Sequence, residues 1–244
     1  MNYVPTYDDV IAAYRLDILK PGGDLQLTAS GDLDLTAYGD LKIGDDRVNA
    51  MRSLVDRWRF NAPTLIGLFK LVTDAQMAKR EFDDEMNNVA STLFDSSAPL
   101  ARFHAIREEI GACAFGEMAC AGAIMVMLHN LLMRFKNDLK ATDADDDWDK
   151  CSPLIEGCSF GSVVTAAANN FRLHDEWARR DPPTEKQMKS IRVIAAVLKV
   201  PIGKNGNGHP FRRNVCPEVV EALSDGNCEE LNRKFFAFAK NMAA

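Results

Sequence analysis

The spacing of apolar residues along the chain changes near residue 45. Before that point a unit of 8 residues occurs three times, each opening with Gly-Asp and alternating apolar with polar residues: Leu25 and Leu27, Leu33 and Leu35, Leu41 and Ile43. Such alternation is typical of a strand with one buried face, and Gly-Asp favours a tight turn because glycine accepts positive φ and aspartate bonds nearby amides. The sequence therefore predicts a small antiparallel β-meander over residues 23–44, whose leucines we expect the following helices to cover.

After residue 45 the apolar residues recur every three or four positions, which is the spacing of amphipathic helices. The pattern predicts one helix from Asp45 to about Asn61, ended by Pro63, and a second helix from Thr64 to Leu93. The segment 96–99 breaks this pattern, and its proline suits the first turn of the next helix.

The run from Ile110 to Leu139 is predicted to be the central helix. It carries small residues at nearly regular intervals, which let another helix approach closely: Gly111, Gly116, Cys120 and Ala123. The approaching helix belongs either to the same chain or to a second copy, so a homodimer is one expectation. The most apolar part, residues 118–128, is shorter than the ~20 residues that span a bilayer, and we expect no membrane association.

Helical signals continue to the C-terminus. An acidic linker over residues 143–149 precedes a helix that ends before Pro182, and Thr184 with Gln187 forms a capping box for a helix over residues 185–199. After a glycine-rich loop, two further helices are expected to start near Pro217 and Asn227. The sequence therefore predicts a mainly α protein: a single helical domain over residues 1–244, with the β-meander near its N-terminus.

Composition and charge narrow the class of protein. The net charge of −6 argues against a surface that matches nucleic acid everywhere. The N-terminal residues show no basic segment followed by an apolar one, so we expect a cytoplasmic protein with reduced thiols. The six cysteines and four histidines show no ligand spacing, and no metal or other cofactor is expected. The acidic linker matches a calcium loop at several positions but has Lys150 where that loop needs glycine, which favours a solvated connection.

Basic residues concentrate in one part of the chain. Residues 157–213 contain ten basic and four acidic residues, a net charge of +6 in a chain whose total is −6. This asymmetry fits either a basic face for RNA or a set of solvated helix faces. The candidate nucleic-acid-binding residues are Arg179, Arg180, Lys204, Arg212 and Arg213.

The densest group of reactive side chains is the segment Asn169 to Trp177, at the polar end of a helix that begins with small apolar residues. This motif resembles the last conserved helix of certain HEPN-superfamily proteins, which are α-helical and occur in toxin, antiphage and RNA-processing systems. The resemblance implies a dimeric, metal-independent ribonuclease with Asn170, Arg172, His174 and Glu176 as candidate catalytic residues. In the superfamily the histidine follows the arginine by four to six residues, whereas here it follows by two.

Two functions from different classes follow from these patterns. In the first, Arg172 stabilises the charge that develops on an RNA phosphate and His174 moves a proton, which requires a second subunit because residues two apart on a helix point about 200° apart. In the same segment, a structural interpretation makes Arg172 and Glu176 a surface pair, His174 a hydrogen-bonded interior residue and Trp177 a core anchor. The second function is a non-catalytic assembly or adaptor protein that uses the β-meander and helices as interaction surfaces.

Overall fold

The computed structural model describes residues 4–35, 39, 41, 43–90, 97–139, 144–179, 182–203 and 211–244. The fold is mainly α, as the sequence predicts. The elements in chain order are α1 (Tyr7–Tyr14), α2 (Asp46–Ala90), α3 (Ser97–Leu139), α4 (Ala144–Lys150), β1 (Leu154–Ile155), β2 (Cys158–Ser159), α5 (Phe160–Arg179), α6 (Glu185–Val197), α7 (Cys216–Ser224) and α8 (Cys228–Ala243).

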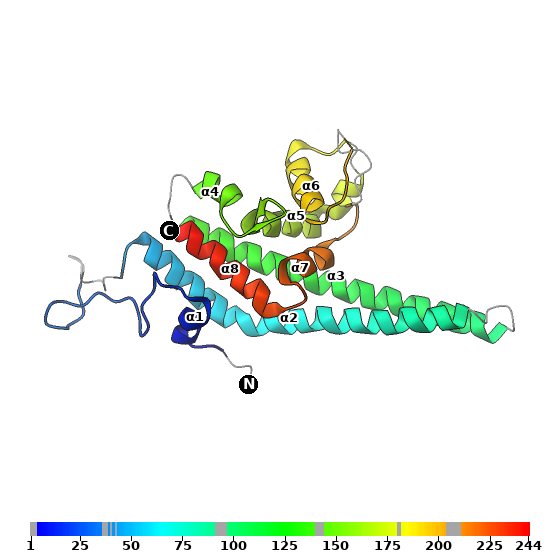
Figure 1. The fold of residues 1–244 in the computed structure, drawn as a ribbon, viewed down its shortest axis with the longest axis horizontal. Coiled ribbons are helices and arrows are strands. Elements are labelled where there is room, and N and C mark those ends of the chain that lie inside the picture. Colours follow the sequence, from blue (N-terminus) through cyan, green and yellow to red (C-terminus); the bar gives the residue numbers. More distant parts are fainter. Residues whose placement is uncertain are drawn as a thin grey trace.

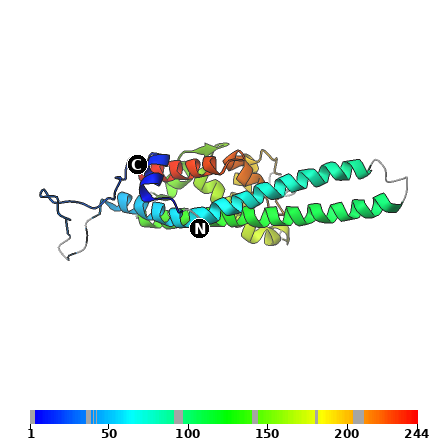
Figure 2. The same cartoon turned by 90° about the horizontal axis from the view of Figure 1, so that it is seen from below.

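Two long antiparallel helices, α2 and α3, form the axis of the molecule. The other helices cover one half of this hairpin, and the other half projects away from them (Figures 1 and 2). Accordingly, the buried residues of α2 end at Val72. In the projecting half, Ile106 of α3 is fully buried, and Arg102 of α3 binds Glu85 of α2 through two hydrogen bonds of 2.7 Å.

The predicted break at Pro63 is wrong, because α2 runs through it without interruption. A proline inside a helix costs about 3 kcal/mol, since it removes one backbone hydrogen bond and crowds the preceding turn. Ala62 and Leu65, on either side, are both only 1% exposed. Burial of this face against the rest of the core therefore outweighs the local cost of the proline.

Aromatic residues pack together where α8 meets α5. Phe160 of α5 packs against Phe235 and Phe238 of α8, with ring centroids 6.5 and 6.1 Å apart. Gly161 permits this approach, because a Cβ atom there would lie 2.5 Å from the Phe238 ring. The terminal helices α7 and α8 begin where the sequence predicts, and α8 completes the core from the far end of the chain.

The capping box predicted at the start of α6 is confirmed, whereas other local elements were not predicted. The Thr184 side chain caps α6, and the side-chain oxygen of Gln187 accepts a hydrogen bond from the Thr184 amide. The predicted acidic linker is wrong in part, because α4 occupies most of it. A similar capping box at Thr6 starts α1, and a two-stranded hairpin of β1 and β2 precedes α5; neither was predicted.

The Gly-Asp-Leu repeat forms a projecting segment that we call the arm, residues 25–44. The predicted glycines take positive φ, with 88° at Gly31 and 84° at Gly39. Antiparallel bridges join the predicted apolar positions: Leu25 to Ile43, Leu27 to Leu33 and Leu35 to Leu41. The described residues of the arm form these isolated bridges and not the continuous strands that the sequence predicts. The two-stranded sheet is formed by β1 and β2, which are not near the N-terminus. The expected covering by helices is wrong, since the arm extends from the end of the hairpin (Figure 1) and Leu27 is 60% exposed.

Candidate functional site

The motif predicted to be catalytic lies on the second half of α5, and its asparagine lies inside the protein. Asn170 is fully buried. Its amide nitrogen donates to the carbonyl oxygens of Phe211 (3.3 Å) and Arg213 (3.1 Å), and its oxygen accepts from the amide of Val215 (2.9 Å). Every hydrogen-bonding atom of the Asn170 side chain is therefore used to hold the segment before α7.

Arg172 and His174 are not brought together within one chain. Arg172 is exposed and donates to the side-chain oxygen of Asn130 on α3 at 3.4 Å. His174 is half-buried, with Nδ1 3.2 Å from the Phe171 carbonyl oxygen and Nε2 3.6 Å from a carboxylate oxygen of Asp175. The two side chains leave the helix about 200° apart, so they cannot act on one phosphate without a second subunit.

Arg172 instead lies near another histidine that the sequence analysis did not select. His129 of α3 is half-buried, and its Nδ1 is 3.4 Å from the hydroxyl of Thr165 on α5. Burial and, next, the positive charge of Arg172 lower the pKa of His129. The pair is formed by packing of α3 against α5, so no local sequence signal could reveal it. A neutral imidazole beside an exposed guanidinium can accept a proton while the arginine binds an anion.

The remaining motif residues have structural surroundings. Glu176 is exposed and accepts a hydrogen bond from Gln187 of α6 at 3.4 Å, which ties the end of α5 to the start of α6. Trp177 is only 1% exposed and anchors the same end of α5 in the core. The proposed surface pair of Arg172 with Glu176 is absent among the hydrogen bonds and ion pairs of the described residues; Arg172 contacts Asn130 instead.

The predicted nucleic-acid-binding residues are spread over several elements. Arg179 ends α5 and is exposed, as is Arg212, whereas Arg213 is paired with Glu218 of α7 at 2.5 Å. Arg180 and Lys204 lie outside the described residues. Two other lysines of the basic segment are paired with acidic residues that precede it, Lys189 with Asp149 and Lys199 with Glu156. These pairs reduce the positive charge that the segment presents.

The acidic segment that resembled a calcium loop is used for structure. Asp149 of α4 accepts hydrogen bonds from Lys189 of α6 (2.8 Å) and from the hydroxyl of Ser162 of α5 (2.7 Å). Burial raises the pKa of Asp149, but these two bonds outweigh it and the net shift is downward. Within the described part of the chain, no group of three metal-ligating side chains occurs.

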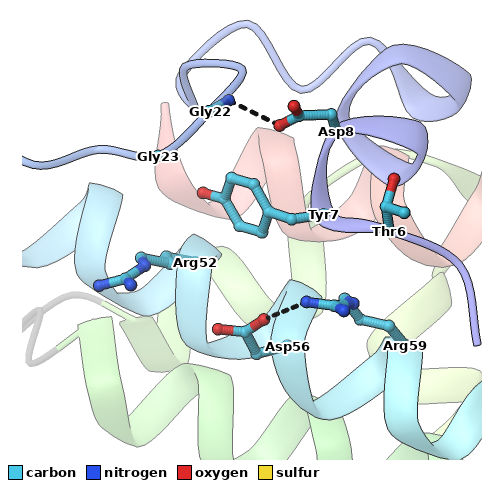
Figure 3. Close-up of a pocket in the computed structure, with 8 residues that line it drawn as sticks. All are labelled: Thr6, Tyr7, Asp8, Gly22, Gly23, Arg52, Asp56 and Arg59. Carbon is cyan, nitrogen blue, oxygen red and sulfur yellow. Dashed lines mark hydrogen bonds and ion pairs between the residues drawn. The ribbon is translucent and has the colours of Figure 1, made fainter.

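A separate cavity of about 410 Å³ lies between α1, the loop that follows it and α2. Figure 3 shows Asp56 between Arg52 and Arg59 on α2, with Tyr7 facing them from α1. Arg59 donates to Asp56 at 3.1 Å, and the Gly22 amide donates to Asp8 at 2.7 Å.

The charges that line this cavity balance. Arg52 and Arg59 face the carboxylates of Asp8 and Asp56, so the cavity favours neither an anion nor a cation. The Tyr7 hydroxyl donates to Asp24, a buried carboxylate, and burial followed by this hydrogen bond raises the pKa of Tyr7. These contacts fasten the start of the arm to the helical body and give no indication of catalysis.

Comparisons with known proteins leave the family open. No protein-family model matches the chain, and neither characterised proteins nor solved structures give a significant match. The resemblance to the HEPN superfamily therefore rests on the motif alone.

Proposed function

We propose that this protein is a non-catalytic assembly or adaptor protein that binds partners through its arm. The observation that carries this proposal is the exposure of the arm leucines: 60% at Leu27, 50% at Leu33, 48% at Leu35 and 47% at Leu41. Exposed apolar groups on a projecting segment are a common feature of interaction sites, because binding removes them from water.

The backbone of the arm suits the same function. Its described residues are joined by isolated antiparallel bridges. A partner segment in extended conformation can pair with the edge of such a structure, and its alternate side chains then contact the leucines. The start of the arm is fixed, because the buried Asp24 accepts hydrogen bonds from Tyr7 and from the Lys20 amide. The partner predicted by this chemistry is a protein segment with alternating apolar residues.

The test is replacement of the four exposed leucines, Leu27, Leu33, Leu35 and Leu41, by serine. We expect unchanged unfolding of the helical body, since these side chains add little to its core, and loss of a stoichiometric partner from complexes purified from the native source. Isotope-labelled mass spectrometry would compare the variant with the wild type. The matched control is Ile66→Ser, because Ile66 is 53% exposed and lies on α2, away from the arm. Equal recovery of the partner by wild type and arm variant would refute the proposal.

A second candidate function is metal-independent binding or cleavage of RNA, and the pair of Arg172 with His129 favours it. A neutral His129 would act as the general base and Arg172 would bind the phosphate, whereas His174 would keep its hydrogen bond within α5. In this candidate, Arg172→Ala should weaken binding and His129→Ala should abolish cleavage in metal-free buffer. His174→Ala is the matched control. Absence of cleavage by the wild type on mixed RNA would reject the catalytic form.

A further inference from the structure

The outer face of α3 is more apolar than a free helix surface should be. This helix contains a stretch long and apolar enough to cross a membrane, and only 28% of that stretch is buried. Ala121, Ile124, Met125 and Leu128 face the core and are fully buried. On the opposite side, Phe115 is 72% exposed. A face of this kind indicates a surface that another molecule covers.

Part of this face is a groove of about 540 Å³. The residues that line it include Val126, Met127 and Leu131 of α3. Phe171 of α5 and Arg57 and Asn61 of α2 also line it. Phe171 itself lies over Gly122, where a Cβ atom would be 2.0 Å from the ring, so the groove wall is set by close packing of α5 on α3. A large apolar side chain from outside fits this groove.

The residues on this face form complementary pairs about Ala121. Residues at equal distances on either side of it along α3 would meet across a two-fold axis, and three of these pairs are complementary: the small Ala119 and Ala123, the apolar Phe115 and Met127, and the oppositely charged Glu108 and Arg134; Ala112 would meet Asn130. At 100° per residue, all eight side chains lie within about 60° of the direction opposite Ala121. Small residues are therefore central, a protruding phenylalanine lies on one side, and the groove lies on the other.

We propose that α3 pairs with α3 of a second copy of this chain, antiparallel and with a two-fold axis near Ala121. The small residues Ala119 and Ala123 let the two helices cross closely. Phe115 of each copy enters the groove beside Met127 of the other, so the same contact forms twice, as an isologous interface requires. The projecting half of each hairpin then lies along the covered half of its partner.

The charges on this face favour a second copy of the chain over a lipid bilayer as its partner. Glu108 and Arg134 are both exposed, and neither has a polar partner among the described residues. The antiparallel arrangement places Glu108 of one copy at Arg134 of the other, twice per dimer. A bilayer would instead desolvate both charges without pairing them, which is costly. The inference goes beyond the proposed assembly function, because it uses no residue of the arm.

The experiment is sedimentation velocity over a wide concentration range, with far-ultraviolet circular dichroism to confirm the fold. The wild type should be a dimer, and Phe115→Ser should weaken the dimer about thirtyfold or more, as expected for a central apolar anchor. Ile66→Ser is the matched control and should stay dimeric, since Ile66 is 53% exposed on the side of α2 opposite Arg57.

A charge exchange tests the antiparallel direction. Glu108→Arg and Arg134→Glu alone should each weaken the dimer, because like charges then meet, and the double variant should restore it. A monomeric wild type, a dimer unaffected by Phe115→Ser, or single and double charge variants of equal strength would overturn the proposal. Binding of the wild type to anionic phospholipid vesicles that Phe115→Ser abolishes would assign the face to a membrane instead. Arm variants should remain dimeric, so failure here is distinguishable from failure of the assembly function.

Discussion

Replacement of Asn170 by alanine separates a structural role of the α5 motif from a catalytic one. The wild-type side chain makes three hydrogen bonds to residues 211–215, and all its polar atoms are satisfied. Alanine would leave two carbonyl oxygens and the Val215 amide without these partners, and Asn170 is fully buried, so water does not reach them freely. The segment before α7 would lose its main attachment to α5.

The size of the effect follows from the number of bonds. Each neutral hydrogen bond contributes about 1 kcal/mol net, and a buried group left unpaired costs about 1 to 3 kcal/mol. We therefore expect Asn170→Ala to lower the free energy of unfolding by about 2 to 4 kcal/mol. Asn169→Ala is the matched control. Asn169 is half-buried and makes one 3.3 Å bond to Ser190, so it should lose about 1 kcal/mol or less.

The assay is urea unfolding followed by circular dichroism, with both variants measured beside the wild type. A shift of the midpoint without a change of slope would show that stability alone has changed. If Asn170→Ala unfolded within about 0.5 kcal/mol of the wild type, the argument that this residue fastens the segment before α7 would be refuted. A stable variant with lost RNA cleavage would further assign Asn170 to catalysis.

Three further predictions follow from packing and electrostatics. Gly161→Ala should destabilise the fold by about 1 to 3 kcal/mol in thermal unfolding, because the new Cβ meets the Phe238 ring; an unchanged melting temperature would contradict this packing. Cys216 should react last of the thiols with a maleimide under native conditions, since it is buried and burial raises its pKa to about 12; early labelling would contradict its position. Arg172→Ala should raise the pKa of His129 in a nuclear magnetic resonance titration, because the Arg172 charge lowers it. The folded pKa of His129 is below its unfolded value of about 6.5, so protonation of His129 favours the unfolded chain. The free energy of unfolding should therefore decrease as the pH falls below 6.5, and this decrease should be smaller in the Arg172→Ala variant.

The local features of this protein follow from its sequence. The three-to-four spacing of apolar residues after residue 45 predicts the helices, and Thr184 with Gln187 predicts the start of α6. The Gly-Asp units predict turns with positive φ, as at Gly31. These signals can be recognised from the sequence because each depends on residues a few positions apart, whose interactions form whatever the rest of the chain does.

Features that depend on packing over long sequence distances were decided by the tertiary structure. Pro63 stays inside α2 because the buried face on either side stabilises the helix more than the proline destabilises it. The arm leucines stay exposed because the helices pack on one another beside the hairpin and leave the arm outside. Arg172 contacts Asn130 and acts electrostatically on His129 because α5 packs on α3, a contact between distant residues that periodicity within either helix cannot specify.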